Sequence, residues 1–285
     1  MTETPRTLDL EILKGWEGRE ESATDFLDLN TLSRIRAFFG LEPSIFRGDP
    51  VDETWHWCFF HAAVPTSGLG QDGHPKTGDF LPPFDLPRRM WGGSRLVFER
   101  PLKAGEEATK TSRVVSVDLK TGKSGKLGLV KVAHEIAQGG HLCRREEQDI
   151  VYREAATGPQ GRGPAPECPD APEVSTTVTA DPVTLFRYSA LTYNAHRIHY
   201  DRDYATTEEG YPGLVVHGPL TASLIAGFAR SQRDRAPLAA FSFRGTSPLF
   251  DGDLFSLNAR SESAAMTLWA ERLGGGMAMT AEARF

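Results

Sequence analysis

Two β-rich runs, separated by a segment dense in Gly and Pro, restrict the fold of this chain more than any other feature. The first run holds four candidate strands within residues 94–152, and the second holds four within 241–285. In both, apolar, β-branched and aromatic stretches alternate with turn residues, as in an antiparallel meander. Residues 157–172 contain almost no large apolar side chain and are typical of a linker. We therefore predict an N-terminal domain over 1–156 and a C-terminal domain over 173–285.

The two runs also resemble each other. Arg95–Glu106 and Phe243–Asp253 each read as a strand, then Pro-Leu, then a turn in which an acidic residue follows Gly. We interpret this as a weak internal repeat of one helix-plus-sheet unit. Apolar spacing and stop signals predict helices over residues 8–18, 24–39, 182–191 and 220–231. Residues 65–87 are rich in Gly, Pro and Asp yet carry apolar side chains, so we expect a lid or binding loop there.

Composition excludes several classes of protein. The 285 residues are 39% hydrophobic and 25% charged, which is typical of a globular chain with a substantial core. A net charge of −6 and scattered Lys and Arg residues argue against a nucleic-acid or anionic-membrane partner. The N-terminus lacks the apolar core of a signal peptide, and no apolar run approaches the length of a membrane span. Three cysteines without metal-ligand spacing suit a reducing compartment, so we expect a cytoplasmic protein.

Functional side chains gather in one segment. Between Tyr193 and Asp201 lie two imidazoles, an amide, a guanidinium and a carboxylate. Residues 213–219 then lead through His217 and Gly218 into an apolar helix. Imidazole exchanges protons near neutral pH, and free N–H groups at a helix N-terminus stabilise negative charge on a carbonyl oxygen. The combination indicates acid–base chemistry on a carbonyl compound.

The same segments resemble the MaoC-like (hydratase 2) family of enoyl-CoA hydratases and dehydratases. The signature of that family is approximately Ser-Gly-Asp-x-Asn-Pro-x-His-x-Asp, followed by a His-Gly before a long helix. Here Thr192–Asp201 and His217-Gly218 stand at those places. The resemblance implies an α+β fold, the tandem (double) hot-dog, in which a curved antiparallel sheet wraps around a long helix in each half.

One subgroup of that family is particularly similar. The form Asn-x-His-Arg-Ile-His-Tyr-Asp is typical of double-hot-dog dehydratases, which include mitochondrial type 2 hydroxyacyl-thioester dehydratases and bacterial hydratases of branched C5-dicarboxylyl-CoA. Residues 80–93, 134–136 and 149–153 look like hydratases of mesaconyl-C4-CoA (3-methylfumaryl-CoA). The resemblance extends from about Trp55 onward. It implies a carbon–oxygen hydro-lyase, with an acyl-CoA substrate, no metal or redox cofactor, and a homodimer.

The resemblance also assigns catalytic roles. It places the base that activates water at His199 and the backbone donor to the thioester oxygen at Gly218. Asn194 stands where the family has a catalytic Asp, and an amide cannot act as a base, although it can hold the water or orient His199. The alternatives are a structural His199 and a Gly218 that only permits a tight turn.

Further candidates would contact the substrate. A mesaconyl-type substrate carries a free carboxylate on Cβ, which a guanidinium binds in bidentate fashion. The candidates are three arginines, Arg88, Arg89 and Arg197, together with His217 and Trp91. The alternatives are surface or interdomain salt bridges for the arginines and core positions for His217 and Trp91.

No competing motif is present. Gly68–Gly73 lacks the preceding strand and the Lys of a phosphate loop, and His56, His61 and His74 have no metal-ligand spacing.

From the family resemblance we predict reversible hydration of a short branched enoyl-CoA, with mesaconyl-C4-CoA to citramalyl-CoA as first choice. An itaconyl-CoA hydratase or a 3-hydroxyacyl-thioester dehydratase is the alternative. A non-catalytic thioester-binding or thioesterase-like module is a further alternative, which Asn194 favours.

Overall fold

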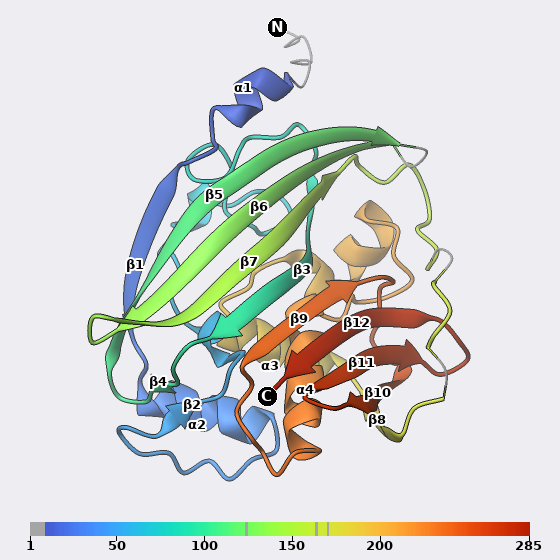
Figure 1. Cartoon of the computed structure of the whole chain (residues 1–285). Helices are drawn as coiled ribbons and strands as arrows, with labels where there is room; N and C mark the ends of the chain where they lie inside the picture. Colours follow the sequence, from blue (N-terminus) through green and yellow to red (C-terminus); the bar gives the residue numbers. More distant parts are fainter. Residues whose placement is uncertain (1–8, 123–124, 163–164, 170) are drawn as a thin grey trace, which may run out of the picture.

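One ten-stranded antiparallel sheet runs through the whole molecule (Figure 1). The computed structural model describes residues 9–122, 125–162, 165–169 and 171–285. The strand order is β1-β5-β6-β7-β3-β9-β12-β11-β10-β8, so the first five strands come from the N-terminal half and the last five from the C-terminal half. The strands of the N-terminal half are β1 (Glu20–Phe26), β3 (Arg88–Phe98), β5 (Glu107–Gly122), β6 (Gly125–Gln138) and β7 (His141–Arg153). Those of the C-terminal half are β8 (Val174–Thr179), β9 (Ala240–Gly245), β10 (Leu254–Glu262), β11 (Ala265–Arg272) and β12 (Met277–Arg284).

The two halves join along β3 and β9, which pair antiparallel with Ser94 opposite Phe243 and Leu96 opposite Phe241. These are the strands that the sequence comparison aligned as equivalent. Antiparallel pairing of equivalent strands is what two related units need to form one continuous sheet. A separate two-stranded sheet, β2 (Pro50–Val51) with β4 (Leu102–Lys103), lies beside the N-terminal half.

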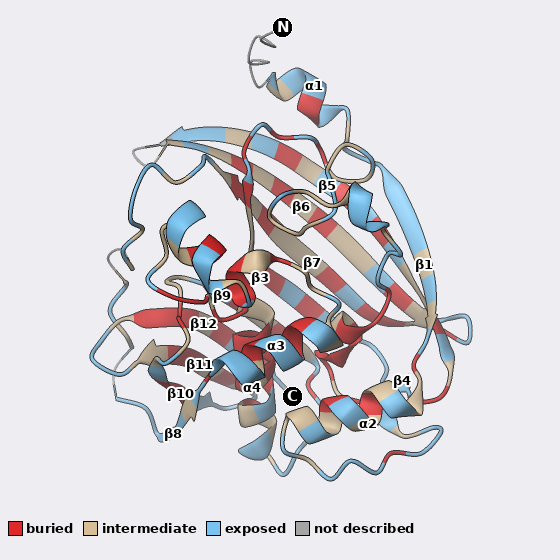
Figure 2. Ribbon diagram, turned by 180° about the vertical axis from the view of Figure 1, so that it is seen from behind, coloured by how far each residue is buried: buried red, intermediate tan, exposed pale blue. Residues whose placement is uncertain are grey.

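Helix α4 (Gly218–Ser231) is the long helix of the C-terminal half. Its apolar face, which includes Leu220 and Ile225, is buried against β9–β12, so the curved sheet wraps around it as predicted. Helix α3 (Pro182–Leu191) matches the predicted bounds, and its N-cap Asp181 accepts a hydrogen bond from the Thr184 N–H. In Figure 2 both helices lie in front of the sheet and bury the sides that face it.

The N-terminal half carries shorter helices, α1 (Leu10–Lys14) and α2 (Leu29–Phe38). The predicted helix over 24–39 begins only at Leu29, because residues 24–26 pair with β5 as part of β1 and Asp28 caps the helix. Helix α2 buries Leu32 and Ile35 in an apolar cluster that also contains Ala108 of β5 and Ile136 of β6. The described residues also form four single-turn helices: η1 (Trp55–Cys58), η2 (Thr66–Gly68), η3 (Arg197–His199) and η4 (Tyr204–Glu208).

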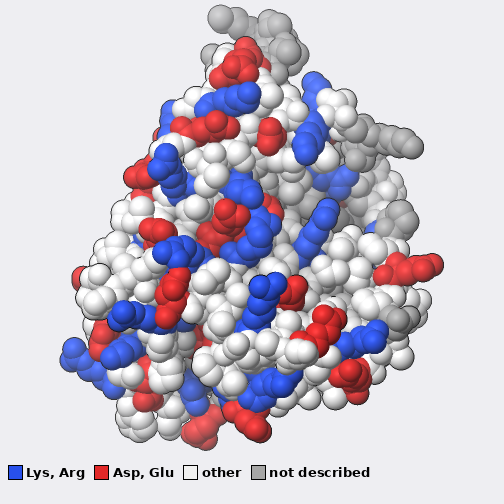
Figure 3. All heavy atoms as spheres, viewed as in Figure 1, with Lys and Arg blue, Asp and Glu red and all other residues white. Residues whose placement is uncertain are grey.

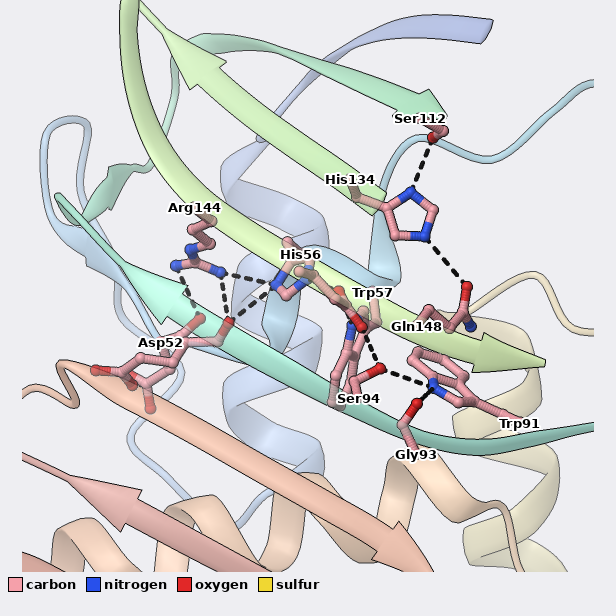
Figure 4. A network of polar contacts seen from close by, with 12 residues as sticks. Asp52, His56, Trp57, Trp91, Gly93, Ser94, Ser112, His134, Arg144 and Gln148 are labelled. Carbon is pink, nitrogen blue, oxygen red and sulfur yellow. Dashed lines mark hydrogen bonds and ion pairs between the residues drawn. The ribbon is translucent and has the colours of Figure 1, made fainter. Parts of the chain in front are cut away.

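A buried polar network crosses the inner face of the N-terminal strands (Figure 4). Its centre is the carboxylate of Glu146 on β7, which is 5% exposed. That carboxylate accepts hydrogen bonds from His56 Nε2–H, Trp57 Nε1–H and the Ser94 hydroxyl at 3.0, 3.0 and 2.7 Å. The network therefore ties η1, β3 and β7 together.

On the face in Figure 3, Lys and Arg are interspersed with Asp and Glu. The ion pairs of the described residues include those that Arg95 makes with Glu147 and Asp149. Among the described residues, no helix is long and apolar enough to cross a membrane. The described part of the predicted linker contains no helix or strand.

Candidate active site

Four imidazoles from three separate segments lie in a row. The ring centroids are 4.0 Å apart between His74 and His196, 5.4 Å between His196 and His199, and 3.6 Å between His199 and His217. His74 belongs to the long loop over 65–87. His196 is the N-cap of η3, His199 is its last residue, and His217 is the N-cap of α4. We refer to these four residues as the histidine row.

His199 has the geometry of a general base. Its Nδ1–H donates to the Val215 carbonyl at 2.7 Å, so the lone pair of the neutral ring is on Nε2. No described residue forms a hydrogen bond with that Nε2. Burial lowers the pKa of His199 to about 4, and the charge of His74 acts in the same direction, against the hydrogen bond to Val215. His199 is therefore neutral near pH 7 and can accept a proton.

His217 and Gly218 form the start of α4 beside His199. The rings of His217 and His199 stack at an interplanar angle of 18°. His217 is fully buried with Nε2 2.9 Å from Ser189 Oγ, which favours a positioning role over contact with substrate. Gly218 is the first residue of the helix, where N–H groups have no partner within the helix. A donor for an oxyanion and a base thus lie side by side.

Asn194 is engaged with the backbone of its own loop. Its side-chain oxygen accepts a hydrogen bond from the backbone N–H of His196 at 3.0 Å, and its backbone N–H donates to the Ser189 carbonyl. Tyr193 before it has a φ of 48°, so the chain turns sharply there. The amide oxygen predicted to hold water or orient His199 therefore supports the turn in this structure.

Two of the three candidate arginines form ion pairs away from the histidine row. Arg197 donates to Asp201 at 2.8 and 3.0 Å, and its guanidinium lies over the Tyr204 ring. Arg88 is buried and donates to Glu209 at 2.7 Å and to the Tyr211 hydroxyl at 2.6 Å. Both match the salt-bridge alternative.

Arg89 is the candidate arginine whose charge acts on the histidine row. Its positive charge lowers the pKa of His74 and of His196, where burial is the larger cause in both cases. It also interacts with the Tyr152 hydroxyl on β7. Successive residues of a strand point to opposite faces, which explains why adjacent Arg88 and Arg89 have different partners.

The long loop brings Asp72 and His74 onto the catalytic segment. The Arg197 N–H donates to the Asp72 carbonyl at 2.9 Å, which fixes the loop against η3. Gly73 between them has a φ of 90°, and a Cβ there would lie 1.9 Å from the Ala195 carbonyl oxygen. The loop predicted to be a lid or binding loop is therefore packed tightly over the histidine row.

Comparison with known proteins identifies the family. Residues 54–251 match the family model described as hydroxyacyl-thioester dehydratase type 2. The chain is also 45% identical over 273 residues to a Chloroflexus aurantiacus protein named mesaconyl-C(4)-CoA hydratase, covering 93% of this chain and 95% of that protein. The chain belongs to the hydroxyacyl-thioester dehydratase type 2 family. The family resemblance inferred from the Asn194–Asp201 motif is thus confirmed.

Solved structures confirm the double hot-dog fold of this dehydratase family member. A MaoC-like dehydratase from Phytophthora capsici matches with a TM-score of 0.72 at 16% identity, covering 98% of both chains. A Mycobacterium tuberculosis protein described as having a double hot-dog fold matches with a TM-score of 0.58 at 13% identity, covering 94% of this chain and 96% of that one.

Trp91 lies next to the donor at Gly218 in this dehydratase fold. A Cβ on Gly218 would be 3.9 Å from the Trp91 carbonyl oxygen. The indole Nε1–H donates to Ser94 Oγ at 2.9 Å, and the ring packs against Trp57 with centroids 5.1 Å apart. Trp91 thus connects the Glu146 network to the start of α4.

Three groups of the loop and motif could hold a metal ion. Ligand atoms of Asp72, His74 and His196 all lie within 4.8 Å of one another. This cluster was not predicted, because His74 is far from the motif in the sequence and the three residues have no metal-ligand spacing. Arg89 argues against a dication there, since its charge already acts on all three groups.

Proposed function

We propose that this protein adds water reversibly to the double bond of a short branched enoyl-CoA, with mesaconyl-C4-CoA to citramalyl-CoA as the first choice. The observation that carries the proposal is His199, which keeps its lone pair on Nε2 and whose ring stacks at 3.6 Å on His217, the residue that precedes Gly218 at the start of α4. Membership of the dehydratase family supports the reaction class. The name of the 45% identical relative supports the acyl group.

The proposed reaction uses protein groups alone. His199 Nε2 takes a proton from water as the water oxygen bonds to Cβ. The π electrons move toward the thioester, and the Gly218 N–H stabilises the resulting enolate oxygen. The same proton then passes from His199 to Cα. Coenzyme A enters as part of the substrate, and we propose that no metal or redox cofactor takes part.

Arg89 is the residue we propose for the substrate carboxylate. In mesaconyl-C4-CoA this carboxylate is on Cβ, the carbon that water attacks. A cation beside the histidine row can therefore bind it while Cβ faces His199, whereas Arg88 and Arg197 are already paired with Glu209 and Asp201. We further propose that the protein acts in the cytoplasm as a homodimer.

A direct assay tests the proposed function. Wild-type protein is incubated with mesaconyl-C4-CoA and, separately, with crotonyl-CoA, while the ultraviolet band of the conjugated thioester is followed. We expect the band to disappear, faster with mesaconyl-C4-CoA. Faster loss with crotonyl-CoA would favour a 3-hydroxyacyl-thioester dehydratase, which the family description also fits. Itaconyl-CoA, whose double bond is not conjugated, is tested by chromatographic detection of citramalyl-CoA. An unchanged band with both conjugated substrates and no citramalyl-CoA would favour a non-catalytic thioester-binding module, whereas loss of the band with release of free CoA would favour a thioesterase-like module.

Replacing Arg89 by alanine should reduce kcat/KM for mesaconyl-C4-CoA about 100-fold, because a charge-assisted hydrogen bond contributes about 1.5–3 kcal/mol. Crotonyl-CoA has no carboxylate, so its kcat/KM should change much less. Arg197→Ala is the matched control, since that guanidinium is paired with Asp201. If the Arg89→Ala protein lost activity equally on both substrates, the proposal that Arg89 binds the substrate carboxylate would be wrong.

A further inference from the structure

The proposed reaction creates a charge that the residues considered so far do not stabilise. When His199 takes a proton it becomes a cation in a buried site, and burial already lowers its pKa to about 4. A carboxylate normally compensates such a charge. Asn194 is neutral, and its side-chain oxygen is bonded to the His196 N–H. The inference drawn here rests on the proposed function and concerns which residue supplies the missing negative charge.

Asp72 is the carboxylate of this cluster. His74 Nδ1–H donates to Asp72 Oδ2 at 2.8 Å, and the Asp72 side chain also accepts from the His74 N–H at 3.0 Å. Burial raises the pKa of Asp72, but the hydrogen bond from His74 outweighs it and holds the pKa below its usual value. Asp72 is therefore ionised at neutral pH and fixes the tautomer of His74, as carboxylate partners of catalytic histidines do.

The second ring nitrogen of His74, Nε2, is available to accept a hydrogen bond. Nδ1 carries the proton that forms the hydrogen bond to Asp72, so the lone pair of the neutral ring is on Nε2. No described residue forms a hydrogen bond with this Nε2. His74 contacts His196, which contacts His199, and a protonated His74 would lower the pKa of His199. Burial and Arg89 lower the pKa of His74, so both His74 and His199 are neutral hydrogen-bond acceptors at pH 7.

We propose that the Asp72–His74 pair is the second catalytic unit of the site and takes the place of the carboxylate that Asn194 cannot provide. His74 Nε2 accepts a hydrogen bond from one hydrogen of the attacking water, while the other hydrogen passes to His199 Nε2. The O–H bond breaks as the O–Cβ bond forms, and His199 returns its proton to Cα. The hydrogen facing His74 stays on the product hydroxyl. Asp72 holds His74 in the tautomer that accepts this hydrogen bond, and atoms and charges balance without a further reactant.

The position of Arg89 agrees with this assignment. The same guanidinium proposed to hold the substrate carboxylate acts electrostatically on Asp72 and His74. A carboxylate on Cβ bound by Arg89 therefore places Cβ beside the pair. Gly73 holds both residues there, because any side chain at that position would collide with the Ala195 carbonyl.

Removing the His74 side chain tests the proposal. We expect His74→Ala to lower kcat for mesaconyl-C4-CoA about 100-fold, within the range of single acid–base groups, with KM little changed. Imidazole added to the assay should restore a substantial part of the lost activity, since it can occupy the vacated space and accept the hydrogen bond. A His74 that only supports the loop would give no rescue. His141→Ala, at an exposed histidine in the β6–β7 turn, is the matched control and should match wild type with or without imidazole.

Two further variants separate chemistry from loop position. Asp72→Asn keeps the shape of the side chain and removes its charge, so kcat should fall about tenfold or more. Gly73→Ala keeps the side chains of Asp72 and His74 but forces their loop away from Ala195. It should therefore lower kcat, and added imidazole should not restore the activity. Full activity in both His74→Ala and Asp72→Asn would overturn the proposal.

One measurement does not depend on the substrate. Nitrogen-15 NMR of histidine-labelled wild-type protein should show His74, assigned by its loss in His74→Ala, as the Nδ1–H tautomer near pH 7. An Nε2–H tautomer would overturn the proposal even if the protein is an active hydratase. Conversely, the expected tautomer with no hydration of any thioester would overturn only the proposed function. One equivalent of bound metal in wild type that is lost in His74→Ala would also overturn the pair and reassign these residues as ligands.

Discussion

The His199→Ala protein should hydrate mesaconyl-C4-CoA about 1,000-fold more slowly than wild type, as expected for loss of a general base. The reason is structural: His199 Nδ1 is committed to the Val215 carbonyl, so Nε2 is the atom left to accept the proton. Steady-state kinetics with the ultraviolet assay measures the loss. Wild-type kcat/KM should also fall as the pH drops through about 4, because the base is then protonated.

His199→Asn is the control that separates catalysis from loop structure. The asparagine amide can still donate a hydrogen bond toward the Val215 carbonyl, but it has no basic nitrogen. It should therefore be as slow as His199→Ala while melting closer to the wild-type temperature. Recovery of a tenth or more of wild-type activity in His199→Asn would mean that His199 acts by holding the loop and that the base is elsewhere.

Local sequence patterns predicted the positions of most helices and strands, whereas the double hot-dog arrangement followed from the family resemblance. Helix α3 has the predicted bounds, and α4 begins two residues before the predicted start. Each of these segments shows its own apolar periodicity and its own start signal. Strand β1 does not: Glu20–Phe26 is polar and mostly exposed, and pairing with β5 is what makes it a strand. Such pairing involves residues almost a hundred positions away, so no local pattern reveals it.

The sequence predicted those parts of the candidate site that lie close to one another along the chain. The motif from Asn194 to His199 and the start of α4 lie within 25 residues of one another, and their chemistry could be read directly. Asp72, His74 and Arg89 approach from the other half of the molecule. The sequence did mark their loop as functional, and it put Arg89 among three equivalent arginines. Only partners in space distinguish Arg89 from Arg88 and Arg197.

Replacing Glu146 by alanine should lower the free energy of unfolding by about 3–5 kcal/mol, the cost of removing one member of a buried charged network. The change would leave the N–H groups of His56 and Trp57 and the Ser94 hydroxyl without their acceptor inside the protein. Urea unfolding at pH 7 measures the loss. Glu146→Gln keeps the volume and one acceptor oxygen, so it should be less destabilised than Glu146→Ala.

The pH dependence of the free energy of unfolding tests whether the negative charge of Glu146 stabilises the protein. Burial alone would raise the pKa of Glu146, but the hydrogen bond from His56, the charges of His56 and His134, and the bond from Ser94 lower it to about 2 from 4.5. A carboxylate with a depressed pKa contributes stability above its unfolded pKa and loses it as the pH falls toward the folded value. Wild type should therefore lose stability between pH 4.5 and about 2, and Glu146→Gln should lack this part of the slope. An unchanged slope in Glu146→Gln would mean that the carboxylate is already protonated in the folded protein. In that case the network that fixes Ser94 and Trp91 beside α4 would be held by neutral hydrogen bonds.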